Sequence, residues 1–434
     1  MGQFTGLLGV AGLLLVAFAL SSDRRQIRPR IIIVGVSLQF VLAFLLLRFE
    51  PVVAVYRRIA LAFTHVLDFS ERGAVFVFGN LPDDDGPWGF VFAAKVLPVI
   101  VFFASATAVL YHLGVMQKIV GAFAWSLQRS LGVTGEEALA CAANMFVGQT
   151  EAPLCIRPFI SRLTRSQLML VMTGGFATIA GSVLSAFVLI LGGDDPAQRV
   201  AFAQHLLTAS AMSAPGAFVM AKLMIPEVED HRSGSAAAVI PTETSNVLDA
   251  AAVGATDGLK LSLNVAAMLI AFVALLALLD WPITAFGGTP LGDRVEAVLG
   301  LEALSLSSML GLLFLPVAYG MGLVGSDALA VGSLLGTSMI ATEFVAYLQL
   351  GDLVRDGGET PVLSARAAAV ASFALCGFAN IPSIAIQIGG LSALAPERRA
   401  DIAALGPRAM LAGAMTCWMT GCIASIVLPA ATAS

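Results

Sequence analysis

Charged residues are scarce in this sequence. Only 12% of its 434 residues are Asp, Glu, Lys or Arg, about half the charged fraction of a typical soluble domain. The net charge of −5 is small for this length and no basic tract occurs, so nucleic-acid binding has no support. Hydrophobic residues instead make up 58% of the chain, and its mean hydropathy is +0.88. This composition indicates a polytopic membrane protein.

Residues that build metal centres and nucleophilic sites are also few. The four His and five Cys residues are scattered, without the spacing of a metal site. No Gly-Lys motif that would bind a phosphate group occurs. A membrane enzyme is therefore not expected, and the cysteines are interpreted as small core hydrophobes. These residues are Cys141, Cys155, Cys376, Cys417, Cys422, His65, His112, His205 and His231.

Apolar windows of about 20 residues predict eight spanning helices. Lys and Arg accumulate in cytoplasmic loops, and residues 21–30 hold four Arg, so both termini are expected outside. Lys95 is expected to extend its stem to the outer membrane surface, and Asp280-Trp281-Pro282 is expected to end the sixth span. The predicted spans are 4–20, 31–47, 89–113, 166–191, 198–224, 259–279, 363–390 and 407–428.

Some segments do not fit a simple span. Residues 52–80 and 116–131 mix charged and apolar positions and predict amphipathic helices lying in the membrane interface. Residues 304–325 are apolar but interrupted by Gly and Pro. The linker 227–245 is the longest hydrophilic stretch and is expected to be mobile.

A carboxylate stands in apolar sequence at Glu151. An ionisable side chain at bilayer depth costs a few kcal/mol, so it indicates a functional site. Gly148 and Pro153 favour a turn between two half-helices, a break tolerated only against protein or a watery cavity. We interpret the segment as a re-entrant hairpin that begins near Thr134 with both ends cytoplasmic. The alternative is an ordinary loop or helix end whose Glu151 reaches water.

In the first half of the chain, Gly and hydroxyl residues in 173–183 indicate either close helix packing or local unwinding of the fourth span.

The second half of the chain mirrors the first. Glu343 is expected at the tip of a second hairpin of opposite orientation, and Pro382 is expected to break the seventh span. An inverted repeat with discontinuous helices indicates a transporter whose substrate sits near the midplane. Two unrelated polar patches, or a channel with a ring of like residues, are the alternatives.

Several motifs follow one another along nearly the whole chain. They are Gly148-Gln-Thr-Glu-Ala-Pro153, Gly175-Phe-Ala-Thr-Ile-Ala-Gly181, Asn246-Val-Leu-Asp-Ala-Ala251, Glu343-Phe-Val-Ala-Tyr347, Cys376-Gly-Phe-Ala-Asn380 with Ser383, and Gly389-Gly-Leu-Ser-Ala-Leu-Ala-Pro396. In this order they resemble the motifs of concentrative nucleoside transporters. The resemblance implies cation-driven nucleoside uptake with sodium as the coupling ion and no organic cofactor; a proton-coupled carrier is the alternative.

The resemblance also implies an architecture. The expected assembly is a homotrimer in a bacterial inner membrane, in which each protomer has eight spans and two oppositely oriented hairpins. A transport domain is expected to move against a trimerising scaffold as an elevator. The expected division is scaffold spans one to three with an interfacial helix in 1–113, the first transport repeat in 114–225, linker, span six and an extracellular helix in 226–300, and the second transport repeat in 301–434.

Site residues follow from the same resemblance. It implies nucleobase contacts from Gln149, Thr150, Glu151 and Val183, and ribose contacts from Glu343, Asn380 and Ser383 with Phe378 beside the sugar. Carboxylate and amide groups are suitable partners for ribose hydroxyls and base edges. The implied sodium ligands are Asn144, Val147, Thr178 and Ile179. This sequence departs from the family at Thr178, where Ser is usual, at Thr342, where Asn is expected, and at Ser338, where some relatives have Lys.

Overall fold

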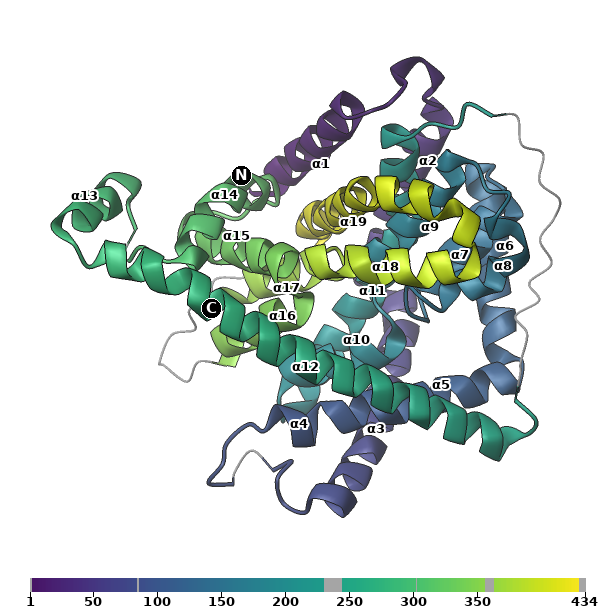
Figure 1. The fold of residues 1–434 in the computed structure, drawn as a ribbon, viewed down its shortest axis with the longest axis horizontal. Coiled ribbons are helices and arrows are strands. Elements are labelled where there is room, and N and C mark those ends of the chain that lie inside the picture. Colours follow the sequence, from purple (N-terminus) through teal and green to yellow (C-terminus); the bar gives the residue numbers. More distant parts are fainter. Residues whose placement is uncertain (1, 84–85, 230–243, 302, 356–362, 429–434) are drawn as a thin grey trace.

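The computed structural model describes residues 2–83, 86–229, 244–301, 303–355 and 363–428. Every regular element within these ranges is a helix, and no strand occurs there. The helices form a packed bundle with one long helix, α12, lying across it (Figure 1). The predicted all-α class is confirmed. Most of the predicted linker, residues 230–243, lies outside the described ranges.

The first part of the chain supplies three spanning helices and a long amphipathic helix, α3. The buried positions of α3 recur every three or four residues, from Ala60 through Leu67 to Ala74, so one stripe of this helix faces the protein. Phe76, by contrast, is 91% exposed. The elements are α1 (Gly2–Ala19), η1 (Arg24–Gln26), α2 (Pro29–Leu47), α3 (Glu50–Phe78), α4 (Phe92–Lys95) and α5 (Leu97–His112).

A second group of elements begins with another amphipathic helix, α6, followed by the arms of the first predicted hairpin. The capping box expected at Thr134 is present, because its hydroxyl accepts from the Glu137 N–H and the Glu137 carboxylate accepts from the Thr134 N–H. The elements are α6 (Val115–Leu131), α7 (Gly135–Asn144), η2 (Ala152–Ile156), α8 (Arg157–Ile160), α9 (Arg165–Ala177), α10 (Gly181–Gly192) and α11 (Pro196–Met224).

The last group repeats this order of helix, hairpin arms, broken span and long span. Residues 304–325 contain a single helix, α14, which runs through Pro316 and then turns by 113° into α15. Span eight begins earlier than predicted, since its helix runs from Arg399 through Pro407. The elements are α14 (Leu306–Gly320), α15 (Gly325–Ile340), α16 (Glu343–Arg355), α17 (Ala365–Ala374), α18 (Ile381–Leu394), η3 (Pro396–Arg398) and α19 (Arg399–Val427).

Between these two groups lies α12 (Val247–Gly287), followed by α13 (Pro290–Leu299). Helix α12 continues through Pro282 to Gly287, so the helix does not end at Asp280-Trp281-Pro282, and the expectation that span six leaves the membrane there stays a prediction. Proline removes one helix hydrogen bond, and the Thr284 hydroxyl donates to the Asp280 and Trp281 carbonyls at 3.1 Å beside this break. Helix α12 has 41 residues, so it is about 60 Å long, roughly twice the thickness of a bilayer core. It must therefore tilt strongly or extend beyond the membrane.

Six segments of the described residues are long and apolar enough to cross a membrane by themselves, and the bent pair α14 and α15 would make a seventh if it counted as one span. Helices α1, α17 and α18 are apolar but shorter. The expected number of eight spans, which takes α1 as one span and α17 with α18 as another, stays a prediction. The six long segments are Pro29–Leu47, Phe92–His112, Arg165–Gly192, Pro196–Met224, Val247–Gly287 and Pro396–Val427.

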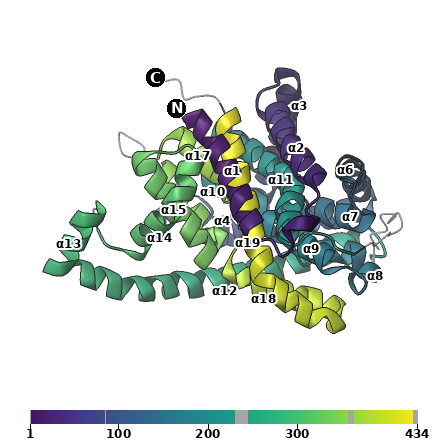
Figure 2. The same ribbon diagram turned by 90° about the horizontal axis from the view of Figure 1, so that it is seen from above.

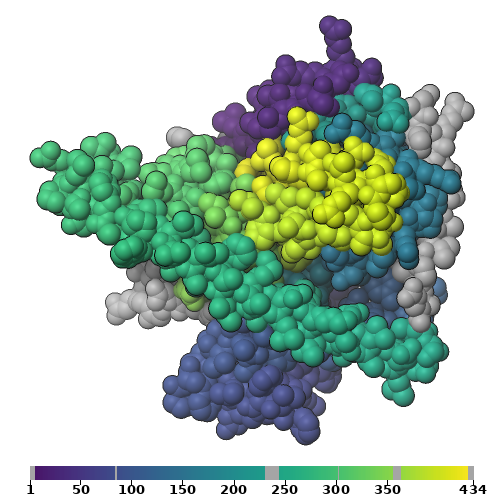
Figure 3. Space-filling model, in the orientation of Figure 1, coloured from purple at the N-terminus to yellow at the C-terminus, as the bar shows by residue number. Residues whose placement is uncertain are grey.

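The spans differ in how much protein surrounds them. The most apolar windows of α9 with α10, of α11 and of η3 with α19 are 94%, 89% and 83% buried. The corresponding window of α12 is only 17% buried, and α12 lies open along one face of the molecule (Figure 3). Helices α9, α10, α11 and α19 therefore form the core. Helix α12 instead presents apolar side chains outward to lipid or to another protein surface.

The two ends of the described chain lie together. Helices α1 and α19 run side by side (Figures 1 and 2). A Cβ atom added at Gly6 would lie 2.6 Å from Ile426 Cγ1, so the start of α1 meets the end of α19. This agrees with the expectation that both termini face the same side of the membrane, and which side remains a prediction.

Candidate functional site

The tip of the first hairpin is a tight polar turn. Helix α7 ends at Asn144, and the Gly148 N–H then donates to Glu151 Oε2 at 2.5 Å. A Cβ atom at residue 148 would lie 2.6 Å from the same carboxylate oxygen, so glycine here lets the carboxylate approach the turn without moving aside. The Glu151 carboxylate thus folds back on its own turn, and its residue stays exposed to the space in front of the tip.

The fourth span unwinds next to this tip. Helix α9 ends at Ala177 and α10 begins at Gly181, with Thr178 in an extended conformation between them. The Gly181 N–H donates to the Phe146 carbonyl at 3.1 Å, which joins the break to the hairpin. Both interpretations given for residues 173–183 apply, since the helix unwinds after Ala177 and a Cβ atom at Gly175 would lie 3.0 Å from Gln149 Cβ.

The seventh span is broken over residues 375–380, and Asn380 organises the break. Its Oδ1 accepts from the Ser383 N–H at 2.8 Å, which caps α18. Its Nδ2 donates to Glu343 Oε2 at 2.5 Å. Pro382 lies in the first turn of α18 rather than in the gap, a position where its missing N–H costs no hydrogen bond.

Both tips and both breaks face one cavity of about 730 Å³, which is within the size range of small-molecule sites. Its far wall consists of α5 and α12, which contribute Thr107, Tyr111, Asp257 and Asn264. Those four residues were not predicted, because nothing in the sequence relates α5 or α12 to the hairpins. The cavity is lined by all eight residues expected to contact substrate: Gln149, Thr150, Glu151, Val183, Glu343, Phe378, Asn380 and Ser383.

Of the four expected sodium ligands, Val147 lines this cavity and the other three, Asn144, Thr178 and Ile179, do not. Asn144 is 1% exposed, and neither Oδ1 nor Nδ2 of its amide has a hydrogen-bond partner within the described residues. The Thr178 hydroxyl donates to the Gly174 carbonyl at 2.9 Å, and a Cβ atom at Gly174 would lie 3.4 Å from Asn144 Nδ2. Amide, hydroxyl and carbonyl groups at an unwound helix suit a hard cation, with Ile179 in the same break.

The other two departures from the family pattern are accommodated locally. The Thr342 hydroxyl accepts from the Val345 N–H at 3.4 Å at the start of α16. The Ser338 hydroxyl donates to the Leu335 carbonyl of its own helix at 3.0 Å. Thr342 also lines the cavity, so the substitution at this position bears on the site, whereas Ser338 makes its hydrogen bond within α15.

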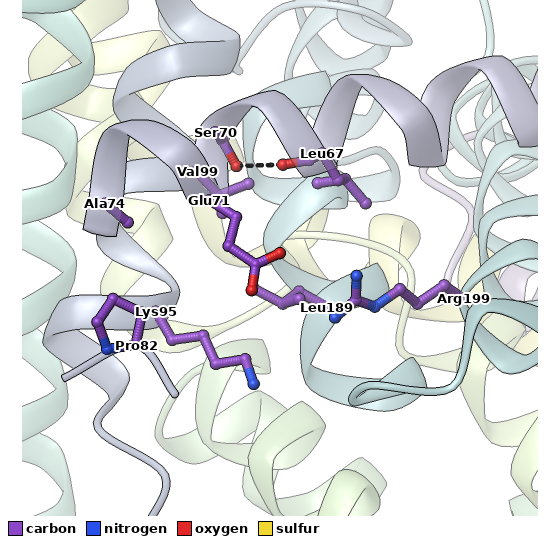
Figure 4. A pocket seen from close by; sticks show the side chains of 9 residues that line it. All are labelled: Leu67, Ser70, Glu71, Ala74, Pro82, Lys95, Val99, Leu189 and Arg199. Atoms are coloured by element: carbon purple, nitrogen blue, oxygen red, sulfur yellow. Dashed lines mark hydrogen bonds between the residues drawn. The ribbon is translucent and has the colours of Figure 1, made fainter. Parts of the chain in front are cut away.

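A second polar cluster lies outside the cavity, between α3, α4 and the turn from α10 to α11 (Figure 4). Lys95 Nζ and Arg199 Nη2 each lie 3.1 Å from Asp194 Oδ1, and Arg199 Nη1 lies 3.6 Å from Asp68 Oδ1. The side chain of Lys95 is 5% exposed. The expectation that Lys95 extends to the membrane surface is therefore wrong, because its ammonium group is buried against a carboxylate.

Sequence comparison decides the class of this site. The profile described as "Na+ dependent nucleoside transporter N-terminus" matches residues 8–81. "Nucleoside recognition" matches residues 93–194, and "Na+ dependent nucleoside transporter C-terminus" matches residues 205–425. The chain belongs to the sodium-dependent nucleoside transporter family.

Full-length relatives agree with this assignment. The chain is 39% identical to an uncharacterized transporter of Haemophilus influenzae, over 99% of this chain and 98% of that one. It is 37% identical to sodium/nucleoside cotransporter 1 of Mus musculus over 98% of this chain, and spans 64% of the mouse protein. The structure of CNTnw in an inward-facing substrate-bound state gives a TM-score of 0.88 at 39% identity, with 98% of this chain and 99% of that chain covered.

Membership in the family confirms the resemblance seen in the motifs. The protein is a nucleoside transporter of the concentrative family and not an enzyme. The family is sodium-dependent. A CNTnw variant in an outward-facing state also gives a TM-score of 0.88, at 38% identity over 98% of both chains, so the shared fold is similar to both states of that protein.

Proposed function

We propose that this chain takes nucleosides, uridine and related pyrimidine and purine nucleosides among them, into the cell by sodium symport. The observation that carries the proposal is the buried pair of Glu343 and Asn380, both of which line the cavity together with Gln149. A ribose offers neighbouring hydroxyl groups, which pair with a carboxylate acceptor and an amide. Such a site rejects sugars that lack a hydroxyl, because its own buried groups are then left unpaired.

The same cavity provides partners for the rest of the substrate. In the proposed arrangement Ser383 and Phe378 lie beside the sugar. The nucleobase meets the first hairpin, whose amide, hydroxyl and carboxylate groups can read a base edge by hydrogen bonds. The proposed base contacts are Gln149, Thr150, Glu151 and Val183.

Sodium is the proposed coupling ion of this chain, held by Asn144, Thr178 and the main-chain carbonyls of Val147 and Ile179. The unpaired amide of Asn144 supports this assignment. A buried polar group without a partner costs about 1–3 kcal/mol, and coordination of a cation by Oδ1 would remove part of that cost. Because the ligands belong to the hairpin tip and the adjacent break, an ion there would stabilise the turn that presents Gln149.

We further propose a homotrimer in a bacterial inner membrane that works as an elevator. The proposed moving body comprises the two repeats, 114–225 and 301–434, and the proposed scaffold comprises 1–113 and 226–300. The open apolar face of α12 supports a role in lipid or subunit contact. The cavity lies between the repeats on one side and α5 and α12 on the other, where relative motion of two bodies would carry a substrate.

Uptake of radiolabelled uridine into proteoliposomes tests the coupling. We expect saturable uptake that accumulates uridine against its gradient when an inward sodium gradient is imposed at equal pH. Uptake that follows an imposed proton gradient and ignores sodium would replace sodium by protons as the coupling ion. Uptake that neither saturates nor runs uphill would rule out symport.

A further inference from the structure

Gln387 is a buried polar residue that contacts the cavity-lining Gln149, and the proposed function gives it no role. It lies in α18 one turn after Ser383 and is 1% exposed. Its Nε2 donates to Gln149 Oε1 at 3.0 Å and to the Met172 carbonyl at 3.0 Å. The side chain therefore joins the broken seventh span to the first hairpin tip and to α9.

The direction of these hydrogen bonds is fixed by the backbone. A carbonyl oxygen can only accept, so the atom of Gln387 that faces the Met172 carbonyl must be the NH2 group. The atom of Gln149 that faces this NH2 group must in turn be its oxygen. Heavy-atom positions alone do not distinguish the oxygen of an amide from its nitrogen. Here the Met172 carbonyl fixes this assignment for Gln387 and, through it, for Gln149. The NH2 group of Gln149 therefore points away from Gln387.

The same direction continues across the cavity wall. Gln149 Nε2 faces Ser383 Oγ at 3.4 Å. The Ser383 N–H, which can only donate, fixes the Asn380 amide with its oxygen toward α18 and its NH2 group toward Glu343. Both amides of the proposed site are thus oriented by backbone groups, Gln149 with its NH2 group toward Ser383 Oγ and Asn380 with its NH2 group toward Glu343 Oε2. An NH2 group has two N–H bonds, so the second N–H of Gln149 is available to a substrate in the cavity that this residue lines.

The fold makes room for this contact. A Cβ atom at Gly175 would lie 2.6 Å from Gln387 Nε2 and 3.0 Å from Gln149 Cβ, a distance at which atoms must shift. A Cβ atom at Gly390 would lie 3.0 Å from Thr150 Cγ2. Glycines on α9 and α18 thus let the hairpin tip and the Gln387 side chain approach closely. The Oε1 of Gln387 has no partner within the described residues. A buried acceptor without a partner lowers stability, so packing alone does not explain a glutamine at this position.

We propose that Gln387 is a positioning residue that holds the Gln149 amide with its NH2 group toward the substrate. The inference rests on the proposed function, in which Gln149 meets the nucleobase. An NH2 group requires an acceptor, so the site selects bases that present a carbonyl there over bases that present an amino group. Uracil and hypoxanthine carry a carbonyl at the position where cytosine and adenine carry an amino group, so uridine and inosine bind more tightly than cytidine and adenosine.

Two substitutions test this orientation by calorimetry on the purified full-length protein. Gln387→Met keeps the approximate volume and removes the donor, so the Gln149 amide can rotate. The ratio of cytidine to uridine dissociation constants, on the order of ten in the wild type, should fall to about one. Gln387→Glu introduces a carboxyl group that, when protonated, donates to Met172 and accepts from the Gln149 NH2 group. The Gln149 oxygen then faces the substrate, and the preference should reverse toward cytidine.

Gln39 provides a matched control. It is also fully buried and donates to a main-chain carbonyl, that of Met212 at 3.0 Å, and to Thr420 at 3.4 Å, but it does not line the cavity. Gln39→Met should leave the base ratio unchanged, and all variants should keep the discrimination between uridine and its 2′-deoxy analogue.

The outcomes separate the inference from the proposed function. A wild-type protein that binds no nucleoside overturns both. A wild type that binds uridine and cytidine equally, or a folded Gln387→Met with an unchanged ratio, overturns only the orientation by Gln387. An equally large change of the cytidine-to-uridine ratio in Gln39→Met also overturns the orientation by Gln387, since the effect would then be structural. If Gln387→Met does not fold, the direction of change in Gln387→Glu decides.

Discussion

Replacement of Glu343 by Gln is the most direct test of the sugar site. The carboxylate is 3% exposed and accepts from Asn380 Nδ2 through Oε2, which leaves its other oxygen available to a sugar hydroxyl. Gln keeps the shape and can still accept from Asn380 with its oxygen. Its second group is then an NH2 donor, so one acceptor and the negative charge are both lost.

The magnitude follows from the type of bond removed. A hydrogen bond to a charged group contributes about 1.5–3 kcal/mol, which corresponds to roughly ten- to a hundredfold in the dissociation constant. We expect Glu343→Gln to fold and to assemble as the wild type does, yet to bind uridine weakly. It should also lose most of the discrimination between a ribonucleoside and its deoxyribose analogue, because the carboxylate is the acceptor that the hydroxyl would satisfy.

Calorimetric titration of uridine and deoxyuridine into both proteins measures this effect. Glu296 supplies the control, since its carboxylate accepts from the Leu304 N–H at 2.6 Å but does not line the cavity. Glu296→Gln should leave both affinities unchanged. Wild-type uridine affinity in a well-folded Glu343→Gln protein would refute the sugar contact and leave Glu343 with a structural or ion-coupling role.

Three further predictions use other parts of the molecule. Asn144→Ala should weaken sodium and uridine binding together, because linked ligands raise each other's affinity by equal factors; an unchanged sodium dependence in calorimetry would remove Asn144 from the ion site. Asp194→Asn should lower the thermal unfolding midpoint in detergent while uridine affinity stays the same, because Lys95 and Arg199 both lose the negative charge of Asp194; an unchanged midpoint would show that the two ion pairs contribute little. A reporter fused at Ser434 should show that this end of the chain lies outside the cytoplasm. Activity of a reporter that works only in the cytoplasm would show that the spans are miscounted.

Much of the fold was predictable from local signals. The Gly148 and Pro153 pair predicted a turn, and the structure has one there because Gly148 admits the Glu151 carboxylate. Thr134 predicted the start of a hairpin arm through its capping box. These features depend on residues within a few positions of one another, so sequence spacing is sufficient to detect them.

Other features depend on contacts between distant segments. The continuation of α12 past Pro282 could not be predicted, since a proline ends a helix in most contexts. The ion pair of Lys95 with Asp194 was not predicted, because the two residues are 99 positions apart in the sequence. Gln387 was missed for the same reason, as Gln149 lies 238 residues earlier. The only local signal was a polar residue one helical turn after Ser383 in an apolar stretch.

The distribution of polar groups around the cavity bears on how transport would occur. The groups proposed to bind substrate all belong to the hairpins and broken spans, while the opposite wall is formed by α5 and α12. Those two helices pack closely, because Cβ atoms at Gly254 and Gly258 would lie 2.6 Å and 2.8 Å from the Cβ atoms of Ala108 and Ala104. Small residues at such a contact let two membrane helices pack tightly. In the proposed elevator, a bound nucleoside would move with the repeats past α5 and α12, whose Thr107, Tyr111, Asp257 and Asn264 line the opposite wall.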